Sequence, residues 1–353
     1  MQIGWIQTLE FRNHRTLSWS PSARLNLLTG ANARGKTNLL EALGFLLTGR
    51  SFRTARVGDI PRWGAEEASV AGELRRADGA RTVRRTIRRL DNGVWCGAGE
   101  DCPWARAVAF GWQDLEILHG GPAARRSFLD GFAARLYASH RAALGRFRQI
   151  LARRNHLLQQ RVSETALAAR LAPWDEQLAT VGMELIDRRR RATAALQTEI
   201  ARIYPNLAGG SHKVEIRYRA SLGEATEPAA FLAALERARA AELQRGQTLV
   251  GPHRDDLAIE LDGVDARAYG SRGQQRLLAL ALRLAEVLPI REAVGTTPVL
   301  LLDDALSELD PQVRQTVLCE IETAEQVFLT SPEPLPAGPG ARWIVTEGEV
   351  AAA

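Results

Sequence analysis

The sequence predicts an α/β fold, in which a mixed sheet surrounds a glycine-bearing loop and is interrupted by an inserted α-helical subdomain. Three observations lead to this class. A short apolar strand at 24–30 ends in glycine and precedes a helical segment at 38–47. Residues 297–304 form a near-continuous apolar run, typical of a strand buried on both faces in the middle of a sheet. Residues 122–203 carry long Ala, Leu and Arg patterns at helical spacing.

The composition is that of an ordinary globular protein. The chain has 353 residues, of which 45% are apolar and 25% charged, and this excludes disorder and fibrous repeats. Its length suits one elaborated domain or two modest ones. No apolar run approaches the roughly 20 residues that span a bilayer, and the N-terminus lacks the order of a signal peptide. We therefore expect a cytoplasmic protein with no membrane partner.

The basic residues are almost all arginine. Lys36 and Lys213 are the only lysines, so arginine supplies the other 44 of the 46 basic residues. Two explanations remain open, a GC-rich genome and phosphate recognition by guanidinium groups. The net charge of +5 permits nucleic acid as a partner without establishing it. Cys96, Cys102 and Cys319 match no zinc or redox spacing, so we assign them no function.

The other strands and helices follow from apolar periodicity and turn signals. A strand at 3–11 opens the chain, and a hairpin at 67–90 turns at Asp78-Gly79. The helical stretch, interrupted by Pro173, predicts two long helices or a short antiparallel coiled coil. The elements expected after it are strands at 213–220, around the turn Asp262-Gly263, at 297–304, at 326–331 and at 343–350, with helices at 228–245, 274–288 and 311–322.

Residues 30–37 match the G-x-x-x-x-G-K-[ST] pattern of a phosphate-binding loop. The two glycines let the backbone wrap close to phosphate, and the following helix start presents N–H groups to it. We expect Lys36 to bridge the β- and γ-phosphates of ATP, and Thr37 to ligate Mg²⁺. The expected nucleotide contacts of the loop are Gly30, Ala31, Asn32, Ala33, Arg34, Gly35, Lys36 and Thr37. The alternative is a chance glycine loop that caps a helix.

Two adjacent carboxylates end the apolar run at 297–304. We expect Asp303 to ligate Mg²⁺, and Asp304 to orient or deprotonate the attacking water. Adjacent carboxylates repel each other, and a bound cation offsets this repulsion. The expected catalytic residues are therefore Lys36, Asp303 and Asp304, although Asp304 alone could instead cap the turn.

A second anion-binding helix start is expected near Ser271. Ser271 and Gly273 precede the helix predicted at 274–288, whose first amides point outward. A lone S-x-G-Q arises easily by chance, but this one lies upstream of the Asp303 strand, in the order of the signature sequence of ABC ATPases. We therefore expect Ser271, Gly273 and Gln274 to bind nucleotide.

With these motifs in this order, the chain resembles the RecF family of bacterial recombination and repair ATPases, which is related to Rad50 and SMC heads. The segments that carry the resemblance are FRNHRTL (11–17), LNLLTGANARGKTNLLEAL (25–43), GRSFRT (49–54), PAARRSFLD (122–130), GPHRDDL (251–257), SRGQQR (271–276) and LLLDDALSELD (300–310). The resemblance implies an ABC-type ATPase head. Its N-terminal part would be residues 1–121, its helical insertion 122–240 and its C-terminal part 241–353.

The resemblance also implies an activity and partners. ATP would lie between two copies of the chain, with the signature serine of one facing the γ-phosphate held by the other, which gives an ATP-dependent homodimer. Such proteins bind duplex DNA and its boundaries with single-stranded gaps. They act with RecR and RecO to help RecA load, which supports the SOS response. We expect a slow, DNA-stimulated ATPase that acts as a switch.

Departures from the family pattern bear on the hydrolysis rate. Ala31, Ala33 and Arg34 stand where the family commonly has Glu, Gly and Gln. Compared with transporter ATPases, Asp304 is a shorter acid, and Thr330 stands where a switch histidine follows the last core strand. Both differences predict slow hydrolysis, because water is positioned less well.

Other residues of these segments have less specific roles. Arg12 and Asn13 match the N-terminal motif and are expected to approach the nucleotide, as is Arg53. Gln113 is either the glutamine that senses Mg²⁺ in ABC proteins or a surface polar residue. His253 is expected to be a structural loop residue.

Three functional classes are compared: a DNA-binding repair ATPase, a transporter ATPase subunit and an SMC- or Rad50-like chromosome-structuring head. The helical insertion favours the first class. Transporter subunits have a shorter helical lobe, and SMC arms need long uninterrupted heptads. The arginines at 75–89 and 188–191 either face DNA or form solvated surfaces. A scaffold that only switches on ATP is a variant of the first class.

Overall fold

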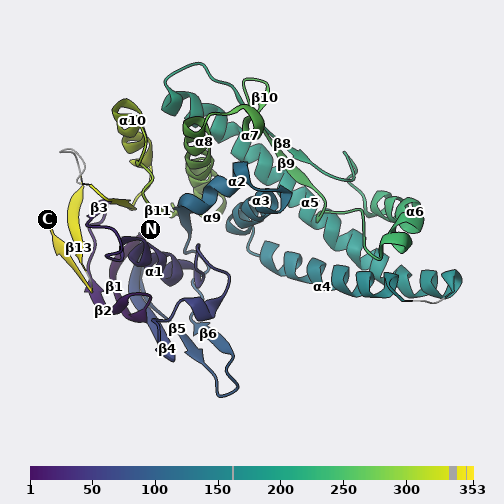
Figure 1. Ribbon diagram of the computed structural model, residues 1–353, viewed down its shortest axis with the longest axis horizontal. Helices are drawn as coiled ribbons and strands as arrows, with labels where there is room; N and C mark the ends of the chain where they lie inside the picture. Colours follow the sequence, from purple (N-terminus) through teal and green to yellow (C-terminus); the bar gives the residue numbers. More distant parts are fainter. Residues whose placement is uncertain (161–162, 334–339, 347) are drawn as a thin grey trace. The chain divides into compact units, whose positions relative to one another are not determined.

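The computed structural model describes residues 1–160, 163–333, 340–346 and 348–353 (Figure 1). Residues 161 and 162 of the expected helical insertion, and Glu347 of the closing segment, lie outside the described residues. The chain divides into two compact units. The first comprises Met1–Leu115, Ile203–Ser211 and Arg272–Ala353, and the second comprises Glu116–Arg202 and His212–Ser271.

An antiparallel sheet with the strand order β2-β1-β4-β5-β6 forms part of the first unit. Its strands are β1 (Gln2–Phe11), β2 (His14–Trp19), β4 (Glu67–Arg76), β5 (Gly79–Arg89) and β6 (Trp95–Gly99). Val70 and Leu74 of β4, with Val83 and Ile87 of β5, are buried, because alternate side chains of a strand point to the same face. The hairpin predicted at Asp78-Gly79 is confirmed.

The second sheet of this unit has the order β14-β13-β3-β12-β11-β7. Its strands are β3 (Leu25–Thr29), β7 (Ala107–Phe110), β11 (Val299–Leu302), β12 (Val327–Ser331), β13 (Ala341–Thr346) and β14 (Glu349–Ala352). The pairs from β13 to β7 are parallel, and β14 is antiparallel to β13. All four residues of β11 are buried, as predicted. It is an inner strand, although only β7 separates it from the edge of the sheet.

Helix α1 (Lys36–Thr48) packs between these two sheets. It contacts β1, β4 and β5 of the antiparallel sheet and β7, β11 and β12 of the other. Ten of its 13 residues are buried, so the helix is apolar nearly all round instead of amphipathic. Gly49, in the left-handed conformation with φ 67°, ends the helix. The phosphate loop therefore leads into the most buried helix of the first unit.

The other helices of this unit are η1 (Val57–Asp59), η2 (Trp112–Leu115), α8 (Arg272–Leu284), α9 (Val287–Val294) and α10 (Pro311–Ile321). The single helix predicted at 274–288 is wrong, because the structure has two. Pro289 has no N–H to donate to the carbonyl of Ala285, and the helix breaks at Ala285 and Glu286, between α8 and α9. Helix α8 also begins earlier than predicted, so Gly273 lies within its first turn and only Ser271 precedes it.

The second unit is mainly helical. Its helices are α2 (Glu116–His119), α3 (Pro122–Leu136), α4 (His140–Leu158), the greater part of α5 (Glu164–Ala208), α6 (Pro228–Arg245) and α7 (Ala266–Tyr269). Helices α4 and α5 run antiparallel to each other (Figure 1), joined by Arg146 to Glu184 at 3.4 Å and by Arg154 to Asp175 at 2.6 Å. Within the described residues, none of the helices has the length and apolar character needed to cross a bilayer.

The interruption predicted at Pro173 is wrong, because α5 continues through it. Proline removes one N–H of the ladder and leaves the carbonyl of the residue four positions earlier without a helical partner. That residue is Ala169, which is exposed, so water can satisfy its carbonyl. The helix therefore tolerates the proline at this position.

Three short strands complete the second unit, in the order β10-β9-β8. They are β8 (Val214–Arg219), β9 (Asp256–Leu261) and β10 (Val264–Asp265). The turn predicted at Asp262-Gly263 joins β9 to β10. Because β9 packs on α3, this unit extends to Ser271, whereas the division expected from the sequence has its boundary at residue 240.

Candidate nucleotide-binding site

The loop from β3 to α1 has the conformation that its glycines allow. Gly30 has a φ of 148° and Gly35 a φ of 99°, values that side-chain-bearing residues rarely adopt. A Cβ on Gly30 would lie 2.5 Å from the carbonyl oxygen of Val345, which leaves no room for one. Ala33 is also left-handed, with a φ of 64°. Residues 31–34 are exposed, so the outer part of the loop faces solvent.

Lys36 lies within the curve of this loop. Its ammonium group donates to the carbonyl oxygens of Gly30 at 2.7 Å and Ala31 at 3.2 Å. The side chain is only 6% exposed, although its charge usually requires water. The fold thus holds a positive charge against the loop, where it can meet a phosphate group.

Thr37 and Asp303 meet at the start of α1 and the carboxyl end of β11. The hydroxyl of Thr37 lies 2.9 Å from each carboxylate oxygen of Asp303. Burial raises the pKa of Asp303, hydrogen bonds from Thr330 and Thr37 act in the opposite direction, and the neighbouring Asp304 raises it further. A buried carboxylate beside a hydroxyl supplies the hard oxygen ligands that Mg²⁺ prefers. These two residues therefore fit the predicted metal site.

Asp304 has its backbone fixed on both sides. Its N–H donates to the hydroxyl of Thr330 at 2.9 Å, and its carbonyl accepts from Arg276 at 2.8 Å. Its φ of 48° is unusual for a residue with a side chain. The sequence distinguishes Thr330 only as the residue that stands in place of a switch histidine. Its contact with Asp304 arises because β12, which carries Thr330, pairs with β11.

The side chains of Arg12 and Asn13 bind helix α1. Arg12 donates to both carboxylate oxygens of Glu41, at 2.8 and 2.6 Å. Asn13 accepts from Asn38 at 2.6 Å. Arg53 also donates to Glu41, at 3.0 Å. These three residues thus bind helix α1, which follows the phosphate loop. A direct contact between them and nucleotide stays a prediction.

The segment after β7 is tied to α8. Gln113 donates to the carbonyl of Phe52 at 3.3 Å, and its role in sensing Mg²⁺ stays untested. The next residue, Asp114, accepts from Arg283 of α8 at 2.5 and 3.0 Å. Burial would lower the pKa of Arg283, but the carboxylates of Asp114 and Glu286 raise it. This ion pair, which no local pattern of the sequence predicts, links helix α8 to the segment that contains Gln113.

The predicted signature residues lie at the start of α8. Ser271 is the last residue of the second unit and is exposed, as is Gly273. Gln274 is half-buried. The N-terminal amides of α8 at Arg272 and Gly273 belong to residues that are accessible from solvent.

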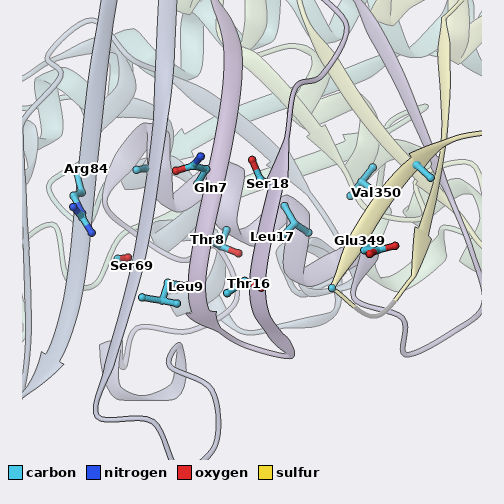
Figure 2. A pocket seen from close by; sticks show the side chains of 13 residues that line it. Gln7, Thr8, Leu9, Thr16, Leu17, Ser18, Ser69, Arg84, Glu349 and Val350 are labelled. Carbon is cyan, nitrogen blue, oxygen red and sulfur yellow. The ribbon is translucent and has the colours of Figure 1, made fainter.

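A separate groove of about 620 Å³ lies along β1 and β2, beside β14 (Figure 2). Its polar lining includes Gln7, Thr16, Ser18, Arg84 and Glu349. None of the residues lining it is among the expected nucleotide contacts, so the groove is distinct from the phosphate loop.

Comparisons with known proteins converge on one family. A family model described as "AAA domain" matches residues 6–164. The DNA replication and repair protein RecF of Heliobacterium modesticaldum is 37% identical over 344 residues, which cover 94% of this chain and 92% of that protein. The protein of the same name from Moorella thermoacetica is 38% identical over 342 residues, which cover 94% and 90% of the two chains.

Comparison with solved structures also finds similarity to RecF. The chain is similar to a structure described as the recombination mediator protein RecF-ATP in the RecFOR pathway, with a TM-score of 0.87, 29% identity and 99% of each chain covered. A Smc head domain from Pyrococcus furiosus gives a TM-score of 0.56 at 18% identity, over 100% of this chain and 96% of that one. The second similarity shows the fold alone. The predicted fold class, an ABC-type ATPase head with added helices, is confirmed.

Proposed function

This chain belongs to the RecF family of DNA replication and repair proteins, and on that premise we propose that it is an ATP-dependent, dimerising DNA-binding protein of replication, repair and recombination. The observation that carries the proposal is the convergence of the phosphate loop, Lys36 and the Thr37–Asp303 pair at one end of a parallel sheet. Ligands of open α/β sheets bind at this end of the strands. The members of this family are ATP-binding ATPases, and one solved structure of the family is described as RecF-ATP.

ATP would bind the amides of the loop and the ammonium of Lys36. Thr37 and Asp303 would hold Mg²⁺, which supplies positive charge beside the phosphates. Asp304, fixed by Thr330 and Arg276, is the candidate to orient the attacking water. We propose slow, DNA-stimulated hydrolysis, in which the bound nucleotide acts mainly as a switch.

The homodimer is proposed from the division of the site. One chain supplies one phosphate loop and one exposed start of α8, so two copies related by a two-fold axis would make two composite sites. Ser271, Gly273 and Gln274 of one copy would face the phosphates held by the other. RecR and RecO are proposed as partners, with RecA as the protein finally loaded, because similar structures are described within the RecFOR pathway. A cytoplasmic location stays a prediction of the sequence.

DNA contact is proposed for the exposed arginines Arg84 and Arg88 of β5. They lie four residues apart on one strand and therefore share a face. Of the run 188–191, Arg189 is not proposed to contact DNA. Arg189 of that run is 2% exposed and binds the carboxylate of Asp130 at 2.8 Å, so it serves the interior of the second unit.

The proposal is tested by duplex-DNA binding with ATP, with ADP and without nucleotide, followed together with the oligomeric state by analytical ultracentrifugation. We expect dimers that hold DNA with ATP only. Lys36→Met should abolish ATP binding and with it the dimer. Lys213→Met is the matched control, because it removes the only other lysine, which is exposed and pairs with Glu215.

Two results would contradict the proposal. Wild-type protein with no affinity for Mg²⁺ and ATP would overturn it entirely. Monomers that bind DNA equally with and without ATP would indicate a plain DNA-binding module.

A further inference from the structure

The turn between β1 and β2 lies along helix α1. The two turn residues and the first residue of β2 contact the helix and the loop end at positions three residues apart, with Arg12 on Glu41, Asn13 on Asn38 and His14 on Gly35. The contacts run antiparallel to the helix, so His14 reaches furthest toward the phosphate loop. The first two contacts join side chains, whereas the third joins a side chain to the backbone of the loop itself.

His14 is fully buried against the last glycine of the loop. Its Nε2 lies 3.2 Å from the carbonyl oxygen of Gly35, and that oxygen also accepts the N–H of Leu39, at 2.8 Å, in the first hydrogen bond of α1. A Cβ on Gly35 would lie 2.7 Å from Cε1 of His14 and 2.8 Å from the amide of Asn13. The imidazole therefore packs directly behind the loop, in van der Waals contact with its backbone.

The chemistry of the contact determines which nitrogen carries the proton. Burial lowers the pKa of His14, and the hydrogen bond to Gly35 offsets this only in part, so the ring is neutral at physiological pH. A neutral imidazole has a single N–H, and a carbonyl oxygen can only accept. Nδ1 has no hydrogen-bond partner within the part of the chain that the structure describes. The proton therefore belongs on Nε2, where it donates to Gly35.

We propose that His14 is a positioning residue for the phosphate loop, which fixes the carbonyl of Gly35 so that the amides of Lys36 and Thr37 are held ready for phosphate. This inference rests on the proposed nucleotide function of the loop. Because Gly35 carries a left-handed φ and no side chain, the contact with His14 adds a second restraint to a carbonyl that is otherwise held by the N–H of Leu39. A pre-ordered loop loses less conformational entropy when it binds its ligand, so the affinity for nucleotide rises.

The test compares His14→Met with His14→Gln in the full-length protein. The two side chains are similar in length and volume, but only glutamine offers an N–H near the position of Nε2. The dissociation constant of Mg²⁺-ATP is measured by isothermal titration calorimetry well below the melting temperature of each variant. We expect His14→Met to weaken binding about tenfold and His14→Gln to stay within about threefold of the wild type.

Each outcome decides the inference. Unchanged affinity in His14→Met, with normal wild-type binding, overturns the role of His14 and leaves the proposed function intact. Equal weakening in both variants also overturns it, because the loss would then come from packing and not from the donor. Wild-type protein that binds no ATP overturns both proposals. Should His14→Met not fold, His14→Phe keeps the ring without the donor and is expected to show the same tenfold loss.

Discussion

The hydroxyl of Thr330 donates to Oδ1 of Asp303 at 2.8 Å while it accepts the N–H of Asp304 at 2.9 Å. The hydroxyl of one side chain near the end of β12 thus connects both acids that follow β11. It donates its single proton to one acid and accepts the backbone N–H of the other. The parallel pairing of β11 and β12 makes this possible, because it brings the carboxyl ends of the two strands side by side.

We expect Thr330→Val to destabilise the protein by about 1–3 kcal/mol, since it leaves the N–H of Asp304 and an oxygen of Asp303 without this partner. ATP hydrolysis should fall with it, because Asp304 loses one of its two backbone anchors. Thr330→Ser keeps the hydroxyl and is the matched control. Urea unfolding and steady-state ATPase assays measure the two effects. Equal behaviour of the valine and serine variants would contradict the assigned hydrogen bonds.

Asp303 and Asp304 are expected to have separable roles. In Asp303→Asn the affinity for ATP should become nearly the same with Mg²⁺ and with EDTA, since the carboxylate ligand is lost. In Asp304→Asn we expect ATP affinity within about threefold of the wild type, with hydrolysis reduced at least about 100-fold. Titration calorimetry and a phosphate-release assay measure these quantities. Hydrolysis that survives in Asp304→Asn would assign the orientation of water to another group.

A buried arginine holds the helices of the second unit together. Arg154 of α4 has no exposed side-chain surface and binds Asp175 at 2.6 Å, Glu242 at 2.7 Å and Thr248 at 2.8 Å. Arg154→Met would leave the buried carboxylate of Glu242 without its cation and Asp175 with Arg239 alone, so we expect a loss of about 3–5 kcal/mol.

The neighbouring Arg153 is exposed, so Arg153→Met is the control and should change stability by less than about 0.5 kcal/mol. The measurement is urea unfolding followed by circular dichroism, read as a shift of the transition midpoint because two units need not unfold together. A loss below about 1 kcal/mol in Arg154→Met would show that the cluster is not required.

Features that are encoded in short segments could be predicted from the sequence. The phosphate loop, the acids after β11 and the helix at 228–245 all depend on local patterns of glycine, charge and apolar spacing. Periodicity identifies the buried face of a strand but not its neighbours, so the sorting of strands into three sheets could not be derived. Helix α5 passes through Pro173 at a point where Ala169 is exposed, and exposure is a property of the folded chain.

The contacts that sequence analysis missed join residues far apart in the chain. Asp114 and Arg283 are separated by 169 positions, and each alone looks like an ordinary surface charge. Thr330 lies 27 residues from Asp303 and meets it only because their strands pair. Such pairs are fixed by tertiary packing, which no window along one sequence contains.

His253 predicts how stability depends on pH. His253 is half-buried, with its ring centroid 5.9 Å from that of Phe147, and its Nε2 lies 3.0 Å from the carbonyl oxygen of Thr248. Burial lowers its pKa from the ordinary 6.5, and the hydrogen bond to Thr248 compensates only in part. These contacts agree with a structural role for this loop residue.

The direction of the effect follows from proton linkage. Below pH 6.5 the unfolded chain binds a proton at His253. The folded chain binds this proton only at a lower pH, because its pKa is lower. The free energy of unfolding therefore falls as the pH falls through this window. His14 has a lowered pKa as well and contributes with the same sign.

His253→Phe should therefore lose less stability than the wild type between pH 7.5 and 5.5, measured by urea unfolding in steps of about half a pH unit. His156→Phe replaces an exposed histidine and is the control, whereas an equal slope in the wild type and in His253→Phe would mean that folding leaves the proton affinity of His253 unchanged.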